Sequence, residues 1–220
     1  ETGRSANCCI LVEWTVGFVE LNIEFLFSGS TSLSTTGYYW ANEIDGHFVG
    51  GLLVLNENAR PVEFHCTTPV RPSQSQRILY GATLGEHVLC ELIPKLLVNK
   101  TRQKPSVILV DQNLLLNCRQ NLNIAVGCIA NESLSGCHKG EGDSSGNHLN
   151  NSTNSELVIG NSAFISVGRL EFSVHSQFRS DELSVQTALE SISKTVDIDE
   201  PFERLVTAIQ EASKSNSKAA

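Results

Sequence analysis

The stretch HFVGGLLVLNENARPVEFHCTT, residues 47–68, decides the fold class. Its first half, residues 48–55, is almost entirely apolar, which is typical of a central β-strand that is covered on both faces. The polar residues that follow predict a turn, and Pro61 opens a second strand at a position where a missing backbone N–H is tolerated. In that second strand apolar and polar side chains alternate, so one face carries Val62, Phe64 and Cys66. We therefore expect a β-hairpin at the centre of a sheet. Within it, Gly50 and Gly51 indicate a bulge or a close approach of another backbone or side chain.

The segments around this hairpin predict more strands and several helices. Residues 17–27 alternate as a half-buried strand does, and residues 82–98 have the apolar stripe of an amphipathic helix. Pro94 is expected to kink or shorten that helix, because it cannot donate a helical hydrogen bond. Further strands are expected at 106–111, 124–129 and 164–175, and helices from about residues 180 and 199. This order favours an α/β (α+β) fold, in which a mixed sheet with a central hairpin is flanked by helices.

One polar segment interrupts the pattern. Residues 131–156 are rich in Asn, Ser and Gly, so we expect a long flexible surface insertion. The part that follows it has only about 60 residues, which is marginal for a separate core. We therefore expect a single α/β domain over residues 17–213 that contains the 131–156 loop. Residues 1–16 form an N-terminal extension that the pattern does not assign to the fold, and residues 214–220 are expected to be a disordered tail.

The bulk composition restricts the partners and the compartment. A net charge of -8 argues against a broad nucleic-acid surface, which needs clustered Lys and Arg, so we expect no nucleic-acid partner. The longest apolar stretch, residues 10–27, is broken by three Glu residues, so we expect no membrane span. The seven cysteines are odd in number and irregular in spacing, which indicates free thiols in the reducing cytoplasm rather than a disulfide framework. The chain also lacks Met, so residue 1 is not expected to be the translation start.

His65 and Cys66 are the sharpest candidates for chemistry. A catalytic cysteine needs a nearby base that converts its thiol to the thiolate. Adjacent residues on a strand point to opposite faces, so His65 cannot easily activate Cys66. The base would have to come from elsewhere in the fold, for example from His47 or His87. The alternative is that Cys66 is a small apolar residue of the core.

Other side chains of chemical interest can be explained as ordinary structure. Helical spacing places His87 and Cys90 on one face of a helix. Four more residues are of zinc-binding types, but their spacing matches no compact zinc motif: Cys128, Cys137, His138 and His148. Four acidic residues could supply an acid–base pair, but solvated surface explains them better: Glu63, Glu86, Glu91 and Asp111. We therefore expect neither a metal nor another cofactor.

The aromatic run Tyr38, Tyr39 and Trp40 is the best candidate for a partner surface, since such residues are common interface anchors. The alternative is that the three rings pack on the sheet. Because no complete catalytic set appears, we expect a non-catalytic module for binding or assembly, with a protein partner or a second copy of the chain. The runner-up is a thiol-dependent enzyme that uses Cys66 as its nucleophile.

Part of the chain resembles a family of uncharacterised bacterial proteins. The resemblance covers residues 43–98 and rests on GLLVL at 51–55, PVEFHCT at 61–67, PVRP at 69–72 and ILYG at 78–81, together with DEPFER at 199–204. The family carries no known activity. The resemblance therefore implies an intracellular bacterial protein and assigns no reaction.

Overall fold

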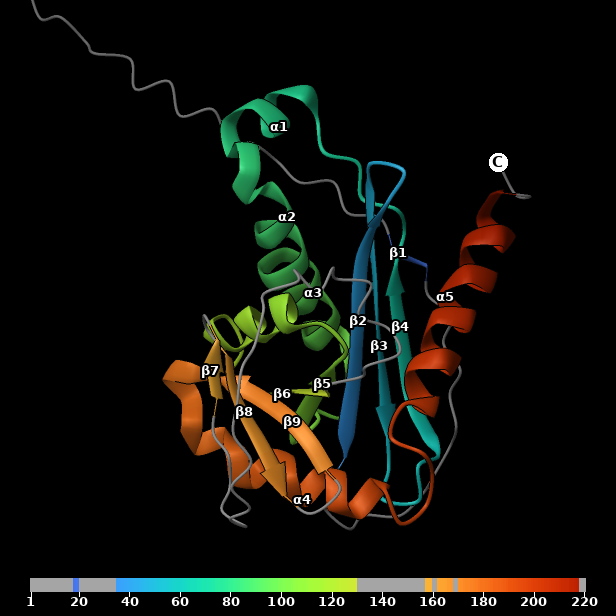
Figure 1. The fold of residues 1–220 in the computed structure, drawn as a ribbon. Coiled ribbons are helices and arrows are strands. Elements are labelled where there is room, and N and C mark those ends of the chain that lie inside the picture. The colour runs from blue at the N-terminus through green and yellow to red at the C-terminus, as the bar shows by residue number, and fades with distance from the viewer. Residues whose placement is uncertain (1–17, 20–34, 130–156, 160–161, 168–169, 218–220) are drawn as a thin grey trace, which may run out of the picture.

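The computed structural model describes residues 18–19, 35–129, 157–159, 162–167 and 170–217. The described chain forms one sheet of nine strands in the order β1-β4-β3-β2-β5-β6-β9-β8-β7 (Figure 1). The strands are β1 (Phe18–Val19), β2 (Thr36–Ile44), β3 (His47–Leu55), β4 (Pro61–Thr67), β5 (Val107–Val110), β6 (Ala125–Ile129), β7 (Leu157–Ile159), β8 (Ser162–Val167) and β9 (Leu170–His175). Most of the strand expected at 17–27 and the whole 131–156 loop lie outside the described residues.

The sheet is mixed, as the sequence predicts. Strands β2, β5 and β6 are parallel to one another, and every other pair in the described sheet is antiparallel. The hairpin of β3 and β4 has the register Gly51 to Cys66. All of β3 except His47 is buried, which confirms a central strand that is covered on both faces.

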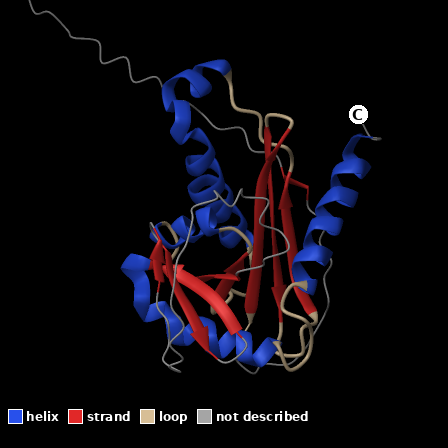
Figure 2. Cartoon of the chain, in the orientation of Figure 1, coloured by secondary structure: helices blue, strands red, loops and turns tan. Residues whose placement is uncertain are grey.

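Helices cover both faces of this sheet (Figures 1 and 2). They are α1 (Gln74–Tyr80), η1 (Gly81–Thr83), α2 (Leu84–Glu86), η2 (His87–Leu92), α3 (Ile93–Lys100), η3 (Asn113–Gln120), η4 (Ser176–Asp181), α4 (Glu182–Ile192) and α5 (Glu200–Ser217). The core has two parts, one on each face. One part packs α4 and α5 against the sheet, and the other packs α2, η2, α3 and η3. The α/β class with a central hairpin and flanking helices is confirmed.

The helix expected at 82–98 is longer than predicted and changes its winding near Pro94. It extends the run of helical turns that begins at Gln74, and it continues to Lys100 instead of stopping at the proline. The turn before Pro94 is a π-helix, in which the N–H of Ile93 bonds to the carbonyl of Val88, five residues back. The wider π turn accommodates the missing N–H of Pro94 without ending the helix.

Helices from opposite faces press on the two glycines of β3. A Cβ placed on Gly50 would lie 2.6 Å from Cγ2 of Ile93 in α3. A Cβ on Gly51 would lie 2.7 Å from Cδ1 of Ile209 in α5. Both distances are shorter than any normal carbon contact, so the close approach that the sequence indicated at this dipeptide is confirmed.

A membrane-spanning helix must be both long and apolar. Among the described residues, no helix is both long enough and apolar enough to cross a bilayer.

Candidate functional site at the carboxyl end of β5

The carboxyl ends of β2, β5 and β6 meet at one edge of the sheet, because these three strands are parallel. In open α/β sheets ligands commonly bind outside the carboxyl ends of such strands. Asp111 directly follows β5 and lies between β6, which ends at Ile129, and β2, which continues beyond this level to Ile44. The edge therefore combines a favourable position with an ionisable side chain.

The carboxyl group of Asp111 is held in an environment that does not suit its charge. Its Oδ1 atom is buried and has no hydrogen-bond partner among the described residues. Burial raises the pKa of Asp111 from 3.8 to about 6, although hydrogen bonds from its own backbone and from Gln112 act in the opposite direction. The group therefore changes its protonation state close to neutral pH, which is the range that suits a general acid or base.

Two neutral side chains interact with the Asp111 carboxyl group, those of Gln112 and Cys128. The titratable group beside it is the thiol of Cys128 on β6, whose pKa rises to about 12 through burial and the nearby Asp111 charge. Ser173 of β9 lies opposite Cys128 in the sheet, and its hydroxyl acts to lower that pKa. The same hydroxyl donates a 3.0 Å hydrogen bond to Oδ1 of Asn113. Cys128 therefore remains an uncharged thiol, and Asp111 is the group of this set that can exchange a proton near neutral pH.

A second polar cluster, on β9, η3 and η4, is structural. The ring of His175 is 1% exposed, and its Nδ1 atom accepts the Gln177 N–H at 3.2 Å. The Nε2 atom of the ring lies 3.0 Å from Nε2 of Gln120. Burial, and then the charge of Arg119, lower the pKa of His175. Arg119 itself is paired with Asp181, with Nε 2.5 Å from Oδ2. Each of these groups has a fixed neighbour, so the cluster fastens η3 and η4 to the sheet.

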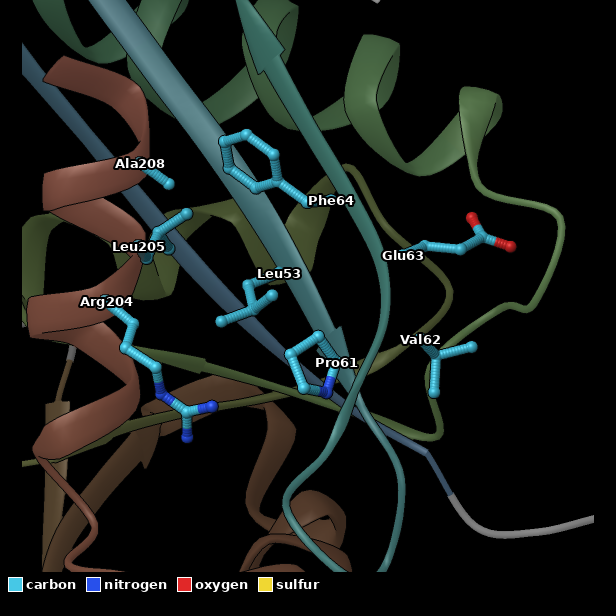
Figure 3. A pocket seen from close by; sticks show the side chains of 8 residues that line it. All are labelled: Leu53, Pro61, Val62, Glu63, Phe64, Arg204, Leu205 and Ala208. Carbon is cyan, nitrogen blue, oxygen red and sulfur yellow. The ribbon is translucent and has the colours of Figure 1, made fainter. Parts of the chain in front are cut away.

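An apolar pocket lies between β4 and α5 (Figure 3). It is lined by Leu53, Pro61, Val62, Glu63, Phe64, Arg204, Leu205 and Ala208, and has a volume of about 550 Å³ including space open to solvent. Its two charged residues are already engaged. Glu63 accepts the N–H groups of Arg102 and Gln103 at 2.9 and 3.0 Å, and Arg204 pairs with Glu200 at 2.6 Å. The pocket can bury an apolar group, but it presents no reactive one.

The structure places Cys66 in the core, and neither His65 nor His87 is placed to act as its base. The side chain is 2% exposed, and burial raises the pKa of its thiol. His65 lies on the opposite face of β4, where its Nε2 atom is 3.1 Å from Oε2 of Glu63. His87 stacks on Tyr80 and lies 3.4 Å from Glu91, away from β4. A buried thiol with a raised pKa is a poor nucleophile, so the thiol-enzyme interpretation fails on geometry.

The aromatic run is part of the core. Tyr38 is 0% exposed and packs edge-on against Phe202 of α5 at 4.9 Å. Tyr39 is 1% exposed, points to the other face and donates to the carbonyl of Leu89 at 2.6 Å. Trp40 is partly buried against the α4–α5 side of the core. The rings of Tyr38 and Tyr39 are therefore not available to a partner.

The residues of metal-binding type that the structure describes do not form a metal site. Cys90 is buried and its thiol donates to the carbonyl of Leu114 at 3.3 Å. Cys128 is also buried, and Cys137, His138 and His148 lie outside the described residues. Among the residues that the structure describes, no group of three or more His, Cys, Asp or Glu side chains is arranged to hold a metal ion.

Asp111 is one of the four acidic residues that the sequence offers for an acid–base pair, but solvated surface is the interpretation that the sequence favours for all four. The available signal for Asp111 was its position. It ends the apolar run of residues 107–110, and an acidic residue at the end of a short buried strand lies where the sheet meets its ligands.

Three solved structures are similar to this chain. Human endonuclease V has 16% identity, covers 85% of this chain and 87% of its own, and has a TM-score of 0.45. Endonuclease V of Bacillus subtilis has 14% identity, coverages of 73% and 72%, and a TM-score of 0.42. Endonuclease V of Ciona intestinalis, in complex with a 23mer DNA containing an inosine followed by a ribo-adenosine, has 15% identity, coverages of 83% and 86%, and a TM-score of 0.43. No protein-family model and no curated protein matches the chain. The resemblance to uncharacterised bacterial proteins therefore stays a prediction.

These matches correct three expectations. All three similar proteins are endonucleases, which contradicts both the non-catalytic binding or assembly module and the enzyme that uses Cys66 as its nucleophile. They also contradict the description of the chain as a protein-interaction module. One of the three structures contains DNA, which contradicts the expectation that nucleic acid is not a partner. With TM-scores below 0.5, however, the likeness assigns no reaction to this chain.

Proposed function

We propose that this chain is an enzyme that transfers a proton at the carboxyl end of β5, with Asp111 as the catalytic acid or base. The observation that carries the proposal is the buried, unpartnered Oδ1 atom of Asp111 at this edge. A carboxylate that leaves one buried oxygen without a hydrogen bond opposes folding, and such residues concentrate at functional sites. Its pKa of about 6 supports the same role, because a base of this strength is largely ionised at pH 7 and can still be protonated during a reaction.

The reaction class that suits a single carboxylate of this kind is hydrolysis. As a base, Asp111 takes a proton from water while the water oxygen forms a bond to an electrophilic carbon or phosphorus atom. The bond to the leaving group breaks in the same reaction, and the proton on Asp111 can then pass to that group. No external oxidant or reductant is needed for this sequence.

Nucleic acid is the first substrate class to test. The probes are labelled DNA and RNA strands, single and paired, with and without an inosine, since one similar structure contains inosine DNA. The likeness only selects the probe, and the proposal rests on Asp111.

The experiment compares the wild-type protein with Asp111→Asn. General acid–base catalysis contributes roughly a hundredfold or more, so Asp111→Asn is expected to lose at least that factor in cleavage rate. The matched control is Asp45→Asn in the β2–β3 turn, where φ is 50° and Asn is well tolerated. If Asp111→Asn cleaves as fast as Asp45→Asn, the assignment of Asp111 is wrong. If the wild type cleaves none of the probes, nucleic acid is the wrong substrate class.

We also propose a cytoplasmic location. The four cysteines that the structure describes are all free thiols: Cys66, Cys90, Cys118 and Cys128. Free, buried thiols fit a reducing compartment. Fractionation of cells that express the tagged protein tests this location, and recovery from an oxidising compartment would contradict it.

A further inference from the structure

Asp111 belongs to a short connection that is tied to strands on both of its sides. Asp111 and Gln112 join the end of β5 to the start of η3 at Asn113. On one side, Nε2 of Gln112 lies 3.5 Å from the carbonyl oxygen of Ala41 in β2. On the other side, Oδ1 of Asn113 accepts the hydroxyl of Ser173 in β9 at 3.0 Å. Neighbouring elements therefore hold the connection that carries the carboxyl group.

The two ties differ in strength. A separation of 3.5 Å is at the limit of a hydrogen bond, whereas 3.0 Å is well within the normal range for a hydroxyl donor and an amide oxygen. Ser173 is also 0% exposed, so water does not compete for its hydroxyl. Asn113 itself is exposed, and this bond is the contact that ties its side chain to a buried strand. The tie to β9 is therefore the stronger restraint on the connection.

We infer that Ser173 and Asn113 are positioning residues that keep the carboxyl group of Asp111 turned into the protein, an inference that rests on the proposed function. A carboxylate moves into water whenever its backbone allows, because hydration of the charge is strongly favourable. Keeping Oδ1 of Asp111 buried and without a hydrogen bond requires a restraint on the residues that follow it, and the Ser173–Asn113 bond supplies that restraint. The titratable neighbour on the adjoining strand is Cys128, whose thiol stays neutral. Cys128 therefore does not replace the restraint when the Ser173–Asn113 bond is removed.

The far end of η3 provides a matched control. The side chain of Gln120 lies 3.0 Å from Nε2 of His175, two residues beyond Ser173 on the same strand. Both contacts fasten η3 to β9 through an exposed amide and a buried side chain of the strand. Only the Asn113 contact adjoins Asp111. A merely structural role would therefore make Asn113→Ala and Gln120→Ala behave alike.

The test is a pH titration of the Asp111 carboxyl carbon by NMR in the wild type, Asn113→Ala, Ser173→Ala and Gln120→Ala. In the wild type the pKa is expected near 6, and in Asn113→Ala and Ser173→Ala it is expected to fall by about one unit or more toward 3.8. Gln120→Ala is expected to keep the wild-type value. The acidic limb of the pH–rate profile should move with the carboxyl pKa.

Each outcome of this titration decides a separate point. An unchanged Asp111 pKa in Asn113→Ala overturns the positioning role and leaves the proposed function standing. Equal shifts in Asn113→Ala and Gln120→Ala also overturn it, because the effect is then general loosening of η3. A wild-type pKa near 3.8 overturns the proposed function itself. Asn113 is exposed, so Asn113→Ala is expected to fold. This variant therefore tests the positioning role even if Ser173→Ala does not fold.

Discussion

The phenol of Tyr39 donates a 2.6 Å hydrogen bond to the backbone carbonyl of Leu89. In an α-helix that carbonyl would accept the N–H of Ile93, but in the π turn this N–H bonds to Val88 instead. The next donor in π geometry would be residue 94, which is Pro94 and has no N–H. A side chain of the central sheet thus supplies the hydrogen bond that the helix cannot make, and it joins β2 to the helical layer.

The first prediction concerns this bond. Tyr39→Phe removes the hydroxyl and leaves the buried Leu89 carbonyl with only a weak 3.8 Å contact from the Cys118 thiol, so the free energy of unfolding is expected to fall by about 1–2 kcal/mol. The control is Tyr38→Phe, because the hydroxyl of Tyr38 is buried and has no partner among the described residues. That variant is expected to be neutral or slightly stabilising. Urea denaturation measures both, and equal losses in the two variants would show that the bond to Leu89 contributes nothing.

The second prediction is that removing the charge of Asp111 stabilises the protein at neutral pH. The pKa of Asp111 is higher in the folded protein than its ordinary value of 3.8, so the folded state binds the proton more tightly. The wild-type free energy of unfolding should therefore fall as pH rises from about 4 to about 6, and should not depend on this group above that range. At pH 7 Asp111→Asn is expected to be more stable by about 1–3 kcal/mol. Parallel stability curves for the two proteins between pH 4 and 7 would contradict this.

The third prediction is that removing the charge of a second carboxylate, that of Asp181, destabilises the protein. Asp181 is 6% exposed and pairs with Arg119, so Asp181→Asn leaves the guanidinium without its partner in a largely buried place. The expected loss of unfolding free energy is about 2–4 kcal/mol. Thermal denaturation at pH 7 should therefore place Asp181→Asn below the wild type and Asp111→Asn above it. A loss of less than 1 kcal/mol for Asp181→Asn would mean that the pair is solvated in solution.

The fourth prediction compares two glycines. A Cβ on Gly127 of β6 would lie 2.4 Å from Cγ1 of Val185 in α4, and Val185 is fully buried. Gly127→Ala is expected to cost about 1–3 kcal/mol through overpacking. Gly85 in α2 has nothing within 4 Å of such an atom, so Gly85→Ala should stabilise the helix by about 0.5–1 kcal/mol. Chemical denaturation of both variants checks the pair, and a neutral Gly127→Ala would show that α4 can move away from the sheet.

Local patterns were enough to predict the hairpin and the helical layers. The alternation in β4 placed His65 and Cys66 on opposite faces, and the structure confirms this separation. The same rule applies to Tyr38 and Tyr39, which also lie on opposite faces, but it was not used for them. Two consecutive tyrosines in a strand that is buried on both sides each reach a core, so neither remains for a partner.

The environment of Asp111 could not be predicted, because residues far apart in the sequence create it. Its burial depends on β2 and β6, and its fixed orientation depends on Ser173, which is 62 positions later in the chain. Whole-chain charge was also a poor guide to partners, since a sum over the sequence does not show where charges lie in space.

The two glycines of β3 have a consequence for how this sequence can diverge. Ile93 of α3 and Ile209 of α5 approach the Gly50–Gly51 dipeptide from opposite faces of the sheet. The distance of each helix from the sheet therefore depends on the absence of a side chain at the glycine that it faces. A side chain added on one face cannot be offset by a smaller residue on the other, because each glycine meets a different helix. Any homologue that keeps both isoleucines and both helices at this spacing must therefore keep glycine at both positions, and loss of either glycine would mark a lineage in which a facing side chain has become smaller or a helical layer has moved.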